Sequence, residues 1–214
     1  MTLINYDFLF FVNFVSVFLI TVSCLKISYR WYKRKLLAFN FITLGIVYPM
    51  IFIFLSYWNY TNSLFLFVIG TTLLCMWTVI LSIATFLINP SKKTWLNYAP
   101  LIYIIVPFIY FYSEDIKLTL IQILDLTGFI VFFAFLKVII FGKKIIKFAG
   151  IFGLVSGLVS IFYTFAVLMQ LNMPVYSSLF INVFMSLSFI SFWYISTKTP
   201  DHFFYDYTYQ KDRK

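Results

Sequence analysis

Charged side chains are scarce in this chain. Only 11% of its 214 residues are Asp, Glu, Lys or Arg, whereas 63% are hydrophobic and 23% are aromatic. An average soluble domain carries about 25% charged residues, so this chain lacks the polar surface needed to cover itself in water. The composition predicts an all-α membrane protein, and the lipid bilayer is its first expected partner.

Histidine and cysteine are nearly absent as well. The single histidine, His202, lies near the C-terminal end, which excludes a metal site built on several imidazoles. Cys24 and Cys75 both fall inside apolar segments, where small packing residues are a better interpretation than a disulfide framework. We therefore expect no metal site and no cofactor.

The side-chain sets that intramembrane catalysis needs are also missing. An aspartyl protease needs two carboxylates, and Asp125 is the only one inside an apolar segment. A serine or cysteine nucleophile needs a base, and no histidine lies inside such a segment. A retinal protein would need a lysine in 177–196, which contains none. We expect a protein that is not an enzyme.

Long apolar segments dominate what is present. A hydrocarbon core of about 30 Å needs about 20 apolar residues per helix. Read with that window, the sequence predicts seven transmembrane helices, at residues 8–28, 36–58, 64–88, 98–112, 118–141, 148–171 and 177–196. The loops between them are short, so we expect one seven-helix domain over 1–196 and a tail over 197–214.

The basic residues predict the direction of these spans. Fifteen of the 16 Lys and Arg residues fall in alternate loops, near the span ends that border those loops, or in the tail, and only Lys117 falls on the other side. Because cytoplasmic loops retain positive charge, we expect the N-terminus outside, the C-terminus in the cytoplasm and a location in the cell (inner) membrane. The net charge of +9 thus reflects topology, and we expect no direct nucleic-acid binding.

The spacing of the spans also suggests two similar halves around a short central span. A shift of 110 residues aligns the spans without gaps and places Lys33 and Arg34 on Lys143 and Lys144. Small sugar transporters are built on such a plan. Few residues are identical between the halves, however. The even spacing therefore reflects either a duplication or chance.

Asp125 is unusual because an ionised carboxylate at a helix centre costs about 2.5–3.5 kcal/mol. It lies about 10 Å below the outer end of its span at 1.5 Å per residue. Counting inward from the outer ends finds polar groups at a similar depth in five spans. They form a candidate ligand-binding layer of Asn13, Thr71, Gln122, Asp125, Thr164 and Asn182. The alternative is a buried hydrogen-bond network that only selects one helix arrangement.

The tail after the last span predicts a further helix. Thr199 suits the N-cap position, Pro200 suits the first turn and Asp201 complements the helix dipole. A helix at this place could pass motion from the membrane to an output domain. A solvated chain end is the alternative interpretation.

Two stretches carry a resemblance to a known family. The tail, "FWYISTKTPDHFFYDYTYQKDRK", and the passage "LINPSKKTWLNYAPLIYIIVPFIYF" resemble bacterial regulators in which a seven-helix membrane sensor region precedes an AraC-type helix-turn-helix domain. Where such a region would show Gly-Pro, this chain has Gly70-Thr71, and these 214 residues contain no helix-turn-helix domain. The resemblance implies a sensor that lacks its output domain or that signals through a separate partner.

The sequence therefore favours a multi-pass sensor that relays an external or intramembrane cue through its tail. Its expected partners are a small ligand outside and a regulator or kinase in the cytoplasm. A small-solute transporter and a non-catalytic assembly subunit remain as alternatives.

Overall fold

The chain is all-α wherever the structure describes it. The computed structural model describes residues 6–61, 63–88, 116–142, 144–168 and 174–199. Within these ranges it contains helices and no strand. The helices are α1 (Tyr6–Arg30), α2 (Lys35–Thr61), α3 (Leu64–Ile88), α6 (Ile116–Phe141), α7 (Lys144–Leu168) and α8 (Pro174–Lys198).

Six of the seven expected spans coincide with these helices, and the expected span at 98–112 lies outside the described residues. Five helices are long and apolar enough to cross a bilayer, over Phe8–Arg30, Lys35–Tyr57, Leu64–Thr85, Ile145–Tyr163 and Ser177–Lys198. The segment Leu126–Ile140 of α6 is a shorter apolar stretch. The chain thus has the helices of a membrane protein, in which every backbone polar group must be satisfied within its own segment.

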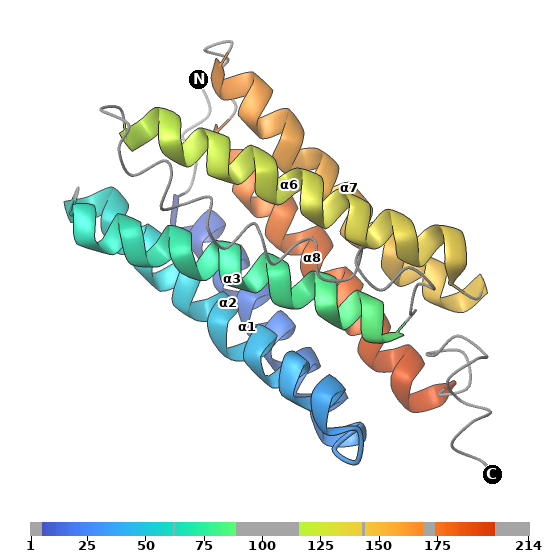
Figure 1. Ribbon diagram of the computed structural model, residues 1–214. Coiled ribbons are helices and arrows are strands. Elements are labelled where there is room, and N and C mark those ends of the chain that lie inside the picture. The colour runs from blue at the N-terminus through green and yellow to red at the C-terminus, as the bar shows by residue number, and fades with distance from the viewer. Residues whose placement is uncertain (1–5, 62, 89–115, 143, 169–173, 200–214) are drawn as a thin grey trace.

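The helices pack in a closed ring in chain order. The principal contacts join α1 to α2, α2 to α3, α3 to α6, α6 to α7, α7 to α8, and α8 back to α1. Figure 1 shows the ring as two layers, with α1, α2 and α3 in one and α6, α7 and α8 in the other. The first and last described helices therefore lie side by side, although more than 140 residues separate them in sequence.

The two groups of three run in the same sense. In Figure 1, α1, α3, α6 and α8 point one way along the bundle, and α2 and α7 point the other way. Hence α3 ends at the end of the bundle opposite to the one where α6 begins. The first residues of α1, α2 and α3 also precede those of α6, α7 and α8 by nearly the same number of residues. The pairs are Tyr6 and Ile116, Lys35 and Lys144, and Leu64 and Pro174. This spacing keeps the duplication hypothesis open.

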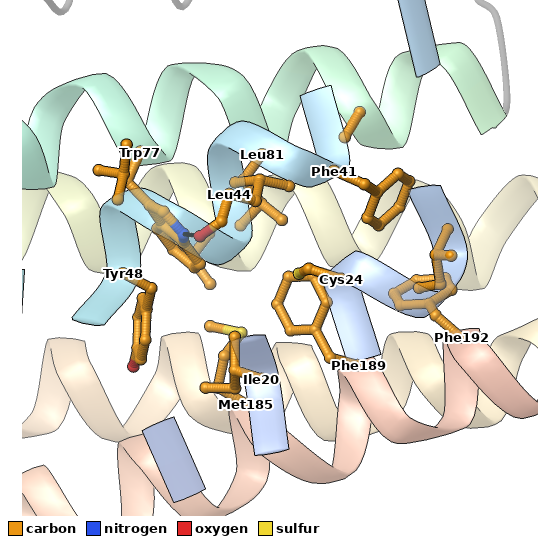
Figure 2. Close-up of a cluster of buried hydrophobic side chains, with 14 of the residues drawn as sticks. Ile20, Cys24, Phe41, Leu44, Tyr48, Trp77, Leu81, Met185, Phe189 and Phe192 are labelled. Atoms are coloured by element: carbon orange, nitrogen blue, oxygen red, sulfur yellow. Dashed lines mark hydrogen bonds between the residues drawn. The ribbon is translucent and has the colours of Figure 1, made fainter. Parts of the chain in front are cut away.

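Large side chains fill the middle of the ring. Trp77, Phe41, Phe189 and Phe192 are each no more than 2% exposed, and Figure 2 shows them with Ile20 and Met185 in one cluster. Phenylalanines elsewhere face outward, and Phe18 is 57% exposed. An apolar outer surface around an apolar core suits a bundle surrounded by lipid.

Glycines let α6 and α7 approach each other closely. A Cβ atom on Gly157 would lie 2.7 Å from the Phe132 nitrogen and 2.9 Å from its Cα, and one on Gly153 would overlap the Phe135 ring. Without a hydrophobic force between helices in lipid, close backbone packing of this kind provides much of the attraction.

Candidate functional site

Three helices meet through a chain of polar side chains. The Tyr48 hydroxyl on α2 donates a hydrogen bond of 2.5 Å to Oδ1 of Asn182 on α8. The Asn182 Nδ2 group in turn donates one of 2.7 Å to Oδ1 of Asn13 on α1. We call these three residues the amide relay. Through these side chains the first described helix, α1, is bonded to the last, α8.

Local packing holds Tyr48 in place. Its ring lies against Trp77 on α3, with centroids 4.9 Å apart at 47°. The Trp77 indole Nε1 donates a hydrogen bond of 3.2 Å to the Leu44 carbonyl, as Figure 2 shows. Pro49 follows Tyr48 directly and has no N–H to donate within α2. Tyr48 therefore sits beside the one residue of α2 that cannot donate a backbone hydrogen bond, and it packs against the Trp77 ring of α3.

The position of Asn182 follows from the pattern of α8. Asn182, Met185, Phe189 and Phe192 recur at helical spacing, and the last three are buried in the core. They share the face of α8 that points into the ring. Asn182 is the polar residue among these four and lies in the N-terminal half of α8. A displacement of α8 relative to α1 and α2 would therefore strain or break the two hydrogen bonds of Asn182.

The relay lies at the edge of the core. Tyr48 is buried, whereas Asn13 and Asn182 are both partly exposed. Asn13 accepts the bond from Asn182, and its own Nδ2 group keeps its capacity to donate. An incoming hydrogen-bonding group could therefore bind Asn13 or replace one partner of the relay. All three side chains are neutral. A ligand would therefore alter the relay by competing for its hydrogen bonds and not by changing a charge.

The structure brings together two residues of the predicted polar layer and separates a third. Asn13 and Asn182 bond directly. Thr71 is fully buried, but its hydroxyl donates to carbonyls of its own helix, 2.8 Å to Phe67 and 3.1 Å to Val68. Gln122 and Asp125 belong to α6, and Thr164 belongs to α7. The side chains of these three residues lie outside the part of the chain that the structure describes. Their place in the layer stays a prediction.

Several polar contacts in the described helices were not expected from the sequence. Tyr48 was missed because counting depth along a helix ignores the reach of a long side chain. Ser156 donates to the Ile181 carbonyl at 3.0 Å, and Ser188 donates to the Ala149 carbonyl at 2.7 Å. These two bonds fix α7 to α8. The feature of the sequence that could have indicated Tyr48 is its place directly before a proline in the middle of an expected span.

Of the tail residues, Thr199 lies within the described chain. Its N–H and its hydroxyl both bond the Ile195 carbonyl, at 3.0 Å and 3.3 Å. It therefore continues the hydrogen bonding of the last turn of α8. Pro200 and Asp201 lie outside the described residues, so the expected tail helix is not tested.

Cys24 and Cys75 are both buried and neither is in a disulfide, as the sequence predicts for packing residues. Comparisons with protein-family models, curated proteins and solved structures find no match to this chain. The site must therefore be interpreted from its own chemistry.

Proposed function

We propose that this protein is a seven-helix sensor of the inner membrane, in which an external cue alters the amide relay and α8 carries the change to a cytoplasmic partner. The N-terminus would lie outside and the C-terminus in the cytoplasm, as the distribution of basic residues favours. The protein would carry no catalytic activity of its own.

The direction of the helices supports seven spans. Because α3 and α6 run parallel, the end of α3 and the start of α6 lie at opposite ends of the bundle, and we infer one more crossing between them. The apolar segment 98–112 has the composition for that crossing. Six spans would require α3 and α6 to be antiparallel.

The observation that carries the proposal is the attachment of α8 to α1 and α2 through Asn182. From Asn182 to Thr199 the helix extends about 25 Å at 1.5 Å per residue. The same helix reaches the basic end of the bundle, where the tail begins. A ligand that breaks the bonds of Asn182 would therefore favour another position of α8, provided that it binds that position more tightly.

The cue would act from the outer side. Asn13 lies near the start of α1 and Asn182 near the start of α8, at the end opposite to most of the cations. A small hydrogen-bonding solute fits the neutral amides. A proton is the other candidate, acting on Asp125, because a carboxylate inside a helix bundle is an expensive group that commonly marks a functional site.

The partner would be a cytoplasmic regulator or kinase. The resemblance to membrane regions that precede AraC-type domains supports this direction of signalling. A partner that binds the tail from Thr199 onward would sense a rotation or shift of α8. Such a shift of α8 can be measured without knowledge of the cue.

The test uses the full chain in nanodiscs, with Cys24→Ala and Cys75→Ala as the background. Spin labels at Thr199→Cys and Lys147→Cys report the distance between the inner ends of α8 and α7. Asn182→Leu removes both relay bonds and imitates the effect of a cue. We expect the distance distribution to shift or broaden in Asn182→Leu.

Ser191→Ala is the matched control, because its hydroxyl bonds only the Leu187 carbonyl of its own helix, at 2.7 Å. It should leave the distance distribution unchanged. Identical distributions in the parent, the control and Asn182→Leu would contradict coupling through the relay. A thermal-shift screen of small solutes in detergent would then search for the cue itself.

A small-solute transporter is the second candidate, and the even offset between the two groups of three helices favours it. Parallel repeats in transporters place substrate sites at the interface between halves, and Asn13 and Asn182 face each other across that interface. Substrate-dependent uptake into proteoliposomes, abolished by Asn182→Leu, would favour transport over sensing. The tight apolar packing around Trp77 favours sensing.

A further inference from the structure

A groove opens between α1 and α2 at the basic end of the bundle. Its volume is about 470 Å³. Leu25 and Tyr29 line it from α1, Phe39 and Ile42 line it from α2, and Ser28 and Ala38 lie buried at its floor. Tyr29 is 81% exposed and Phe39 is 66% exposed. The groove is therefore a shallow apolar channel on the outer surface of the bundle.

Cations surround the mouth of this groove. Lys35 lines the groove beside Tyr32. Lys26, Arg30 and Lys33 lie within the same ten residues of sequence and are exposed. Arg34 lies over the Trp31 ring, 5.9 Å from its centroid. This turn thus gathers five positive charges where the apolar channel ends.

The sequence provides few negative charges nearby. No Asp or Glu occurs between Asp7 and Glu114, so α1, α2 and α3 contribute none at this end. The inner end of α8 adds a further cation, Lys198. A cluster of this kind attracts anions from outside the protein, and clusters of basic residues beside transmembrane helices bind anionic lipid headgroups.

We propose that this groove binds one anionic glycerophospholipid, with an acyl chain along the channel between α1 and α2 and the phosphate at Lys35 and Arg30. The phenol groups of Tyr29 and Tyr32 would lie at the level of the glycerol, where aromatic residues with a polar end are favoured. The combination of an apolar channel and a basic mouth matches an amphiphile that carries both an acyl chain and a negative charge. This proposal depends on the protein being in a membrane and is independent of the proposed sensing function.

The test compares the full chain in nanodiscs of phosphatidylcholine alone and of phosphatidylcholine with phosphatidylglycerol. After transfer to detergent, native mass spectrometry counts the lipids that stay bound, and thermal unfolding gives the stabilisation by added phosphatidylglycerol. We expect one phosphatidylglycerol to be retained and the unfolding temperature to rise.

The double variant Lys35→Gln and Arg30→Gln removes the two charges at the mouth. We expect its apparent affinity for phosphatidylglycerol to fall roughly 10- to 30-fold, since each cation near an anionic surface contributes about 1 kcal/mol. The matched control is Lys144→Gln with Lys147→Gln, which removes the same net charge from the start of α7, a helix that does not line the groove. The control should bind as the parent does.

Further arms of the test separate the sources of the anion. Inorganic phosphate and glycerol phosphate carry the charge without an acyl chain, and neither should raise the unfolding temperature. Equal stabilisation by inorganic phosphate would identify a simple anion site and overturn the lipid proposal. Equal retention of phosphatidylglycerol by the double variant and the control, or of both lipids by the parent, would also overturn it.

Discussion

The side-chain amide of Asn182 donates a 2.7 Å hydrogen bond to Asn13, so the last helix of the described chain is tied to the first. The Tyr48 hydroxyl bonds the same amide from the second helix. Asn182 is therefore the shared member of two interhelical bonds. The other interhelical hydrogen bonds described above join two helices each, whereas the bonds of Asn182 connect three.

We expect Asn182→Leu to lower the free energy of unfolding by about 1–2 kcal/mol, because it leaves Tyr48 and Asn13 without their partner. Tyr48→Phe removes one bond and should cost about 0.6 kcal/mol. Unfolding in mixed micelles measures both values. In the double variant the two losses should not add, since both include the same bond; simple additivity would contradict the relay.

The contact between α6 and α7 provides a second prediction. Gly157→Ala should destabilise the protein by about 1–3 kcal/mol, because the new Cβ meets backbone atoms of Phe132 at 2.7 Å and 2.9 Å. Gly128→Ala is the matched control at the same interface, where the nearest atoms are side-chain atoms of Ser160 and Ile161 at 3.1 Å. Equal losses of unfolding free energy in the two variants would contradict the prediction that the close backbone contact at Gly157 causes the larger loss.

Trp77 joins the core to α2 and supports Tyr48. Trp77→Phe keeps an aromatic ring but removes the hydrogen bond to the Leu44 carbonyl, so we expect a loss of about 1–2 kcal/mol in unfolding free energy. Trp193→Phe, at a partly buried position of α8, should cost less. Chemical denaturation of the two variants in detergent compares them, and a larger loss for Trp193→Phe would contradict this ranking.

The helices could be predicted from the sequence because the bilayer imposes a simple rule. Each crossing needs about 20 apolar residues with every backbone group bonded internally, and the expected span at 64–88 has the same bounds as α3. The helix α7 begins earlier than expected, at Lys144, because a helix can extend beyond the apolar core into the interface. Composition predicts the apolar length and not the full helix.

The candidate site could be predicted only in part. Asn13 and Asn182 were recognised by their equal depth, and they bond as members of one layer should. Depth alone ignores the direction in which a side chain points around its helix. Thr71 has the same depth but bonds its own helix, and Tyr48 lies deeper along α2 yet reaches the layer with its hydroxyl.

Asp125 provides a prediction about the cue. If the proposed pocket uses this carboxylate, Asp125→Asn should abolish the response to external pH or to a bound solute while the helix bundle stays folded. The distance between labels at Thr199 and Lys147 is the measurement, recorded at external pH of about 5.5 and about 7.5 in the parent and the variant, because carboxyl groups in apolar surroundings titrate above their usual range. A variant that keeps the whole response would remove Asp125 from the mechanism.

The direction of the chain through the membrane is the last prediction, because the external cue and the cytoplasmic tail both depend on it. In a background of Cys24→Ala and Cys75→Ala, Lys33→Cys and Lys198→Cys should react with a membrane-impermeant maleimide only after cells are permeabilised. Ser63→Cys, between α2 and α3 at the opposite end of the bundle, should react in intact cells. The reason is that translocating a loop with several cations is unfavourable. Reaction of Lys33→Cys in intact cells as fast as that of Ser63→Cys would contradict this orientation and, with it, an inward-facing tail.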